Sequence, residues 1–381
     1  MGLFFGIIGG LLILVFLVVV HELGHAVIAR RNGVVVEEFG IGFPPRAWAR
    51  KLKNGVTLTL NYLPLGGFVR MQGEHDAANQ KGDYGAASFW QKTRILLAGV
   101  VINWLVAVIL LTVLALTGLP KILPNQFTIA SDTTLVKRPI ELTTVTKDSP
   151  AAMAGLQTGD QILRFNGAMV PSADALAAQT KAHKGQRVEV IYSRSGVEHS
   201  TQVALRSVNS NNQGYLGVSS GQRELLQATW SAPLVGVATT AQFTWVTFQG
   251  LGNLVANLAK GIVFQFSPNG NTRHEARQAI AVAGGSVGGP VRIVGTIFPA
   301  AEQAGLTQVV FLTAIISLTL AVMNVLPIPA LDGGRWFTMV VFRLLKKPLT
   351  KEREEKIQTI GFLVLMSLVI VVTVADVSKL F

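Results

Sequence analysis

Two histidines, His21 and His25, lie four residues apart, and Glu22 directly follows the first of them. On a helix, residues i and i+4 share one face, so both imidazoles can bind a single metal ion. The carboxylate between them can take a proton from an attacking water. The spacing therefore predicts a hydrolytic zinc centre. The alternative interpretation is a chance group of ionisable residues at a helix end.

The residues that precede this group strengthen the chemical interpretation. Residues 3–20 are all apolar or glycine, so the ionisable side chains lie inside a helix long enough to cross a membrane. Ionisable groups are costly in such a helix, and by default they are functional.

The composition is typical of a polytopic membrane protein. Half of the 381 residues are hydrophobic and 14% are charged, and the mean hydropathy is +0.45. Basic residues that flank apolar spans explain the net charge of +12, and no nucleic-acid motif accompanies them, so no nucleic acid is expected as a partner. Cysteine is absent, so a zinc site must use His, Asp, Glu or water.

Apolar runs and turn signals predict a polytopic α-helical membrane protein of about four spans, with a membrane-associated β-hairpin region and one inserted α+β domain. Asn54-Gly55 between two strand-like runs predicts the hairpin. The expected segments are a first span with the zinc motif at 1–33, a cytoplasmic-side re-entrant β region and loop at 34–93, a second span at 94–120, the inserted domain at 134–208, interfacial amphipathic helices and a linker at 222–300, a third span at 305–334, a basic cytoplasmic loop at 335–358 and a fourth span at 359–378.

A catalytic zinc usually has three protein ligands and one position open to water. The other four histidines lie in polar segments, whereas Asp332 is the only acidic residue in or next to the third apolar run, 309–331. Pro327 and Pro329 interrupt the helix just before it and open space around the carboxylate. Asp332 is therefore the expected third ligand; the alternative is a turn residue before Gly333.

Helix direction is consistent with this ligand set. His21 lies near the inner end of the first span and Asp332 at the end of the third, so both helices must cross the membrane in the same direction. A single intervening span gives this parity, so we interpret the apolar but interrupted stretch 224–266 as interfacial. Residues 30–94 hold ten Lys and Arg against five Asp and Glu, which places them in the cytoplasm. The active site is then toward the cytoplasmic side, and the inserted domain and both termini are exocytoplasmic.

Two motifs together resemble those of one family. His-Glu-Leu-Gly-His at 21–25 and Asn-x-x-Pro-x-Pro-x-Leu-Asp-Gly at 324–333 are similar to the motifs of the site-2 protease family of intramembrane zinc metalloproteases. The likeness to bacterial members implies a place in the bacterial inner membrane. The resemblance implies that His21, His25 and Asp332 bind Zn2+ and that Glu22 is the base. It also implies that Asn324 holds substrate or stabilises the oxyanion.

The resemblance extends to the inserted domain, with departures elsewhere. Residues 149–167 resemble the signature of bacterial PDZ domains, which implies either a peptide receptor or a filter that excludes large ectodomains. Better-known relatives carry two PDZ domains, whereas one is found here. The family often has Gly-Pro in the second span near its Asn; here Gly99 is followed by Val100, and Asn103 is present. Asn103 by itself predicts a helix–helix contact.

The activity implied by the resemblance is regulated intramembrane proteolysis. The expected substrates are pre-trimmed single-span membrane proteins of the anti-sigma factor or remnant signal peptide type, cleaved within the lipid bilayer. The backbone of Phe39, Gly40, Ile41, Gly42 and Phe43 is expected to hold the unwound substrate by strand addition. The competing hypothesis is a non-catalytic membrane zinc-binding or PDZ adaptor protein, which would be expected to have lost Glu22 or a ligand.

Overall fold

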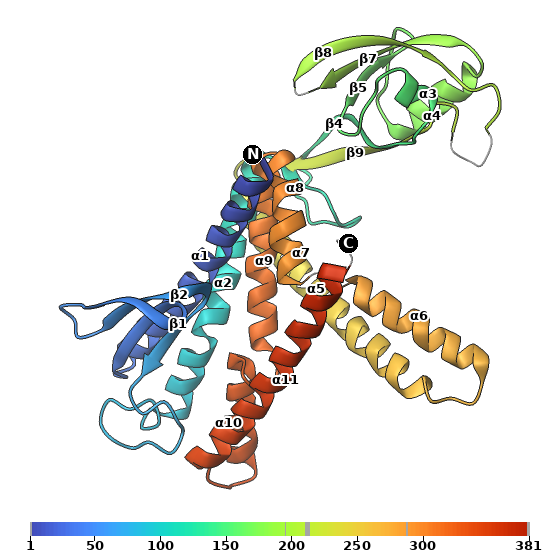
Figure 1. Cartoon of the computed structure of the whole chain (residues 1–381). Helices are drawn as coiled ribbons and strands as arrows, with labels where there is room; N and C mark the ends of the chain where they lie inside the picture. Colours follow the sequence, from blue (N-terminus) through green and yellow to red (C-terminus); the bar gives the residue numbers. More distant parts are fainter. Residues whose placement is uncertain (1, 195, 210–213, 287–288, 379–381) are drawn as a thin grey trace. The chain divides into compact units, whose positions relative to one another are not determined.

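A computed structural model describes residues 2–194, 196–209, 214–286 and 289–378 (Figure 1). The chain divides into two compact units. The first, which we call the helical unit, comprises residues 1–114 and 233–381, and the second, the inserted unit, comprises residues 115–232. Each unit is described separately below.

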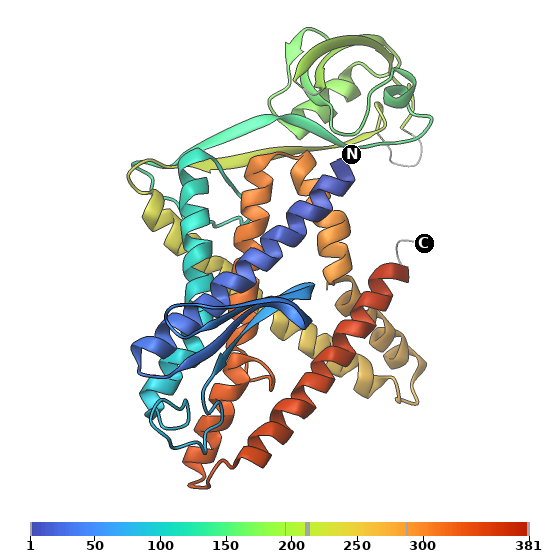
Figure 2. The same ribbon diagram turned by 60° about the vertical axis from the view of Figure 1, so that its left-hand side comes forward.

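Four helices in the described ranges are long and apolar enough to cross a membrane, which agrees with the predicted number of spans. They are α1 (Gly2–Arg31), α2 (Phe89–Thr117), α9 (Leu306–Val325) and α11 (Lys351–Ser378). A helix satisfies its backbone hydrogen bonds internally, which an apolar environment requires. In both views α1 and α9 run in one direction, and α2 and α11 run in the opposite direction (Figures 1 and 2). The hypothesis of three ligands requires this common direction of α1 and α9, because His21, His25 and Asp332 must lie at the same end of the helices.

A chain of helices leads into α9. It comprises α5 (Ala232–Phe264), α6 (Gly270–Ser286), α7 (Pro290–Arg292), the π-helical turn η2 (Ile293–Ile297) and α8 (Phe298–Gln303). Helix α5 is not among the four membrane-length candidates of the described chain. The sequence-based boundary at 222 is wrong, because residues 222–227 belong to a strand of the inserted unit, β9 (Val218–Gln227), and pair with another strand there.

The predicted third span, 305–334, is interrupted. Helix α9 ends at Val325, and a new helix, α10 (Asp332–Leu344), begins at Asp332. Proline supplies no backbone N–H and clashes with the preceding turn, so Pro327 and Pro329 end the helix. The predicted basic loop at 335–358 is mostly helical, since α10 and the start of α11 occupy most of it.

The predicted hairpin is present as β1 (Val36–Lys51) and β2 (Thr57–Met71). Its turn is closed by the Leu52 N–H donating to the Val56 carbonyl at 2.8 Å, with Gly55 at φ +88°. Residues 46–51 of β1 pair with 57–61 of β2. Residues 38–41 of β1 pair with 57–60 on one side and with 67–70 on the other. The sheet therefore has four rows, in the order 46–51, 57–61, 38–43 and 67–71.

One buried core fixes the C-terminal end of α1 against the sheet and two other helices. Its members are apolar side chains from α1, the hairpin, the following loop, α2 and α10, and include Ala26, Ala29, Val36, Val69, Met71, Tyr84, Ile95, Leu96 and Met339. The indole N–H of Trp336 on α10 also donates to Thr93 Oγ1 on α2 at 3.1 Å. This core holds in register the elements that carry the predicted ligands.

The inserted unit is an antiparallel sheet with two short helices, α3 (Pro150–Met153) and α4 (Ala173–Ala182). The strand order is β3 (Leu119–Pro120), β9, β4 (Thr134–Val145), β5 (Gln161–Phe165), β7 (Arg187–Arg194) and β8 (Val197–Ala204), with β6 (Ala168–Met169) beside β5. Its core includes Ile140, Leu142, Ile162, Phe165 and Val190. The sheet extends past the predicted limits of 134–208, because β9 pairs with β4 from beyond residue 208.

Candidate zinc site

The structure brings His21, His25 and Asp332 together in the helical unit. His21 Nε2 lies 3.1 Å and His25 Nε2 lies 3.2 Å from Asp332 Oδ2, and the two Nε2 atoms are 3.3 Å apart. Ligand atoms at about 2.0–2.1 Å from a tetrahedral zinc are separated by roughly 3.3 Å. The donor set and its spacing therefore fit zinc.

Gly99 on α2 keeps the space beside both imidazole nitrogens free of a side chain. A Cβ at this position would lie 2.4 Å from His25 Nε2 and 2.6 Å from His21 Nε2. No side chain can approach so closely, whereas a zinc ion bonds to imidazole nitrogen at about 2.0–2.1 Å. The local sequence gives no sign of this close approach, because it depends on which helix packs against Gly99.

A backbone carbonyl of α2 sets the tautomer of His25. His25 Nδ1 lies 2.8 Å from the Ile95 carbonyl oxygen. A carbonyl oxygen only accepts hydrogen bonds, so Nδ1 carries the proton and Nε2 presents its lone pair to the metal position. The helices approach closely enough for this bond because Gly24 has no side chain: a Cβ there would lie 2.9 Å from the Ala98 carbonyl oxygen.

Asp332 is held at the start of α10 by two glycines. A Cβ at Gly333 would lie 2.3 Å from the Val325 carbonyl oxygen, and one at Gly334 would lie 1.9 Å from the Ile328 carbonyl oxygen. Only glycine allows the new helix to pack this closely on the segment that follows α9. The Ala330 N–H donates to Gln358 Oε1 on α11 at 2.7 Å, which fixes the same segment from the other side.

Glu22 lies between the two histidines in sequence and is half-buried. A Cβ at Gly67 of β2 would lie 3.4 Å from Glu22 Cγ, so the side chain of Glu22 faces the outermost row of the sheet. Asn324 instead donates its side-chain N–H to the Leu320 carbonyl at 3.0 Å, within its own helix. The role of Asn324 in holding substrate or stabilising the oxyanion stays a prediction.

The pairing contradicts the expected strand addition at Phe39, Gly40 and Ile41, whereas for Gly42 and Phe43 it stays a prediction. Residues 39–41 lie between two rows of β2: Phe39 is opposite both Leu58 and Val69, and Ile41 is opposite both Leu60 and Gly67. A row that is paired on both sides has no free backbone groups for another strand. Row 67–71, an outer row, instead approaches Glu22 at Gly67. The sequence predicted a simple hairpin of two strands. It did not predict that residues 38–41 pair with two stretches of β2, because this pairing depends on how the strands bend.

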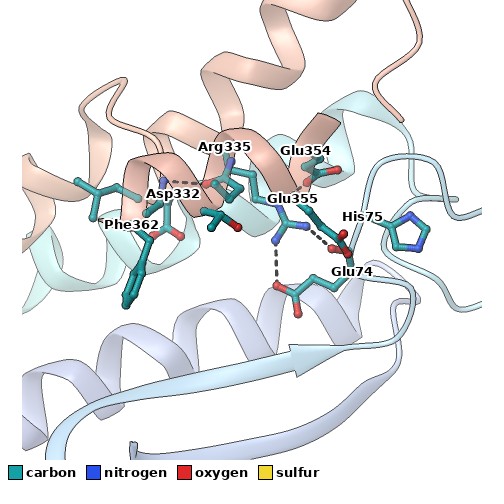
Figure 3. Close-up of a pocket in the computed structure, with 11 residues that line it drawn as sticks. Glu74, His75, Asp332, Arg335, Glu354, Glu355 and Phe362 are labelled. Carbon is teal, nitrogen blue, oxygen red and sulfur yellow. Dashed lines mark hydrogen bonds and ion pairs between the residues drawn. The ribbon is translucent and has the colours of Figure 1, made fainter. Parts of the chain in front are cut away.

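A polar pocket of about 560 Å³ opens beside Asp332 (Figure 3). Arg335 of α10 donates to Glu74 Oε1 at 2.8 Å and to the Glu74 carbonyl at 2.7 Å, and also to Glu354 Oε1 of α11 at 3.0 Å. The guanidinium carbon also lies 4.7 Å from the ring centre of Tyr84, whose pKa is raised by burial. Arg335 thus joins α10, α11 and the loop after the hairpin around a pocket that Asp332 also lines.

These features define the class of the protein. Two imidazoles from one membrane-length helix, a carboxylate from a second segment and an adjacent glutamate are the parts of a zinc metalloprotease site. The profile of Peptidase family M50 matches residues 9–368, and the chain belongs to this family. It is a zinc metalloprotease.

This chain matches its curated relatives over nearly their whole length. Zinc metalloprotease RasP of Shouchella clausii is 28% identical over 450 residues, covering 96% of this chain and 97% of the relative. RasP of Geobacillus kaustophilus is 26% identical, covering 96% of each chain. The regulator of sigma-W protease RasP of Bacillus subtilis is 25% identical, again covering 96% of each chain. The PDZ domain of an SdrC-like protein from Listeria monocytogenes matches 25% of this chain at 19% identity with a TM-score of 0.20, a similarity too slight to establish a fold.

Proposed function

We propose that this protein hydrolyses peptide bonds within the transmembrane segments of pre-trimmed, single-span membrane proteins. The observation that carries the proposal is the convergence of His21, His25 and Asp332 beside Glu22, on helices that are long and apolar enough to cross a membrane. A protease whose catalytic residues lie on such helices is suited to substrates that are themselves in the membrane. The name of one relative, regulator of sigma-W protease, supports anti-sigma factors as one substrate type, with remnant signal peptides as the other.

In this mechanism, bound zinc supplies a Lewis acid that activates water and polarises the scissile carbonyl. His21, His25 and Asp332 hold the ion. Glu22 takes a proton from the attacking water and later passes it to the leaving amine. Asn324 is the proposed residue for holding the substrate or stabilising the oxyanion. The pocket beside Asp332 supplies the route by which water enters a site otherwise surrounded by apolar helices.

The substrate helix must unwind before cleavage, because its carbonyl groups are otherwise bonded and covered. We place the receiving strand edge at residues 67–71, next to Glu22, in place of residues 39–43. An extended peptide added to this outer row would pass close to the base. The outer place of this row in the sheet and its approach to Glu22 at Gly67 support this position.

The inserted unit is the proposed PDZ domain, on the exocytoplasmic side, with the active site toward the cytoplasm. The basic excess in residues 30–94 supports this orientation. We favour a filter that admits trimmed ectodomains over a peptide receptor, because the sequence before Glu141 lacks a clear carboxylate-binding glycine loop. In this role the domain restricts which membrane proteins reach the zinc site.

The decisive experiment compares bacterial membranes containing the wild-type protein with membranes containing Glu22→Gln. The substitution preserves side-chain shape and removes the base, so zinc should remain bound while single-span proteins accumulate uncut in the membrane proteome. Zinc content measured on the same purified variant is the control for an intact site. A zinc-loaded Glu22→Gln protein that cleaves at the wild-type rate would contradict the assignment of the base, and an unchanged proteome would favour the adaptor hypothesis.

A further inference from the structure

One face of α2 lines the zinc site. Ile95, Gly99 and Asn103 follow one another at intervals of four residues, which places them along one side of a helix. The Ile95 carbonyl accepts a hydrogen bond from the Nδ1–H of His25, and Gly99 leaves space beside both Nε2 atoms. Asn103 is the third member, and its side chain faces His21.

Asn103 is fully buried, with an exposed fraction of 0%. Its side-chain Nδ2 lies 3.4 Å from His21 Nδ1, while its Oδ1 is buried without a hydrogen-bond partner among the described residues. The backbone carbonyl of Asn103 accepts from Ser317 Oγ on α9 at 2.8 Å. The backbone is therefore anchored, and only the amide group remains to be oriented.

The chemistry of His21 determines this orientation. His21 binds the metal through Nε2, so its neutral ring carries the proton on Nδ1. An amide NH2 group facing Nδ1 would require an unprotonated Nδ1 and a proton on Nε2, which would prevent metal binding. A half-turn of the amide exchanges two atoms of similar size and leaves one buried amide atom without a partner in either state. The turned state gains an N–H···O bond, so it is the favoured one.

We propose that Asn103 is a positioning residue of the zinc site. Its side-chain oxygen accepts the Nδ1 proton of His21, fixes the ring tautomer and directs Nε2 toward the ion. The Ile95 carbonyl accepts a hydrogen bond from His25 Nδ1 in the same way. Helix α2 therefore orients both imidazoles of α1. A helix–helix contact alone would not require an acceptor at this position.

The test measures zinc affinity of the purified full-length protein by competition with a chelator. Asn103→Asp keeps an acceptor and removes both donors, whereas Asn103→Leu keeps the approximate shape and removes every polar group. We expect Asn103→Asp to bind zinc within about threefold of wild type or more tightly, and Asn103→Leu to bind 10- to 100-fold more weakly, the usual effect of removing a partner of a metal-ligating histidine. Should Asn103→Leu fail to fold, Asn103→Ala replaces it.

Two further variants separate the proposal from its alternatives. Ser317→Ala removes the contact between α9 and the Asn103 backbone without touching the amide, and it should leave the zinc affinity unchanged. His21→Ala sets the scale for loss of a ligand. The proposal is overturned if Asn103→Leu binds as tightly as wild type, if Asn103→Asp loses as much affinity as Asn103→Leu, or if Ser317→Ala loses as much. An unchanged affinity in His21→Ala would overturn the ligand assignment itself. Proteolysis is not part of the readout, so the proposed substrates can fail independently.

Discussion

Replacing Gly99 by alanine tests the geometry of the zinc site most directly. The added Cβ would lie 2.4 Å from His25 Nε2 and 2.6 Å from His21 Nε2, whereas non-bonded atoms prefer separations of roughly 3.5 Å. Each imidazole nitrogen must therefore retreat by about 1 Å, or the two helices must separate. The methyl group would also crowd the space beside both imidazole nitrogens.

The expected loss of zinc affinity follows from the narrow range of metal–ligand distances that a metal site tolerates. Metal–ligand distances in a working site hold to about 0.2 Å, so a shift of about 1 Å breaks at least one bond. Losing an indirect partner of a ligand typically reduces affinity 10- to 100-fold. Disturbing two ligands directly should exceed that, and we expect a loss of at least about 100-fold. The helix itself should not suffer, because alanine favours helix over glycine by about 1 kcal/mol.

The assay is chelator competition on purified protein, with zinc content per chain as a second measurement. Gly9 of α1 provides a matched control, because it is also a glycine in a membrane-length helix and a Cβ there would meet nothing within 4 Å. Gly9→Ala should bind zinc as wild type does. If Gly99→Ala also binds one zinc per chain within about threefold of the wild-type affinity, the ion does not occupy the space beside Gly99 and the proposed site geometry is wrong.

Three further predictions concern the rest of the helical unit and the inserted unit. Arg335→Met should remove the part-buried pair with Glu354 and the exposed pair with Glu74 and cost about 2 kcal/mol, the usual size for a lost hydrogen bond to a charged group, seen as a lower unfolding temperature; an unchanged temperature would show that the ion pairs add no stability. Because the chain has no cysteine, a single cysteine at Arg70, in the outer row 67–71, should cross-link to a cysteine-bearing substrate held by a Glu22→Gln background. A single cysteine at Lys51, in the opposite outer row, should not, and equal cross-linking would refute the chosen edge. Replacing residues 119–227 by a flexible linker should preserve cleavage of trimmed substrates and permit cleavage of untrimmed ones in a substrate assay; a folded, zinc-loaded deletion that no longer cuts trimmed substrates would instead favour the receptor role.

Local patterns accounted for much of the fold in advance. Runs of apolar residues predicted the four membrane-length helices, because a membrane-spanning helix needs an uninterrupted apolar sequence. Asn54-Gly55 predicted the turn of the hairpin, because these residues readily take the backbone angles of a tight turn. The spacing of His21 and His25 predicted a shared ligand face, because a helix repeats every 3.6 residues.

Pairing between segments far apart in the chain could not be predicted from the sequence. Strand β9 joins β4 across a long sequence separation, and the second pairing of residues 38–41 depends on a bend in β2. Neither changes the local sequence pattern, since alternation along a strand does not show which neighbour it has. The break between Val325 and Asp332 had a clear local signal in Pro327 and Pro329, yet the start of a separate helix at Asp332 became visible only in the folded chain.

The sequence by itself determined which groups could do the chemistry: two imidazoles on one helix face, a glutamate beside them and an aspartate after a proline-broken helix. The tertiary structure decided how α2 serves that chemistry. One face of α2 carries the space beside Gly99, the Ile95 carbonyl that accepts a hydrogen bond from His25 and the amide of Asn103 that faces His21. None of them is a metal ligand by type. They act through the close approach of two helices, and that approach depends on the packing of the whole helical unit.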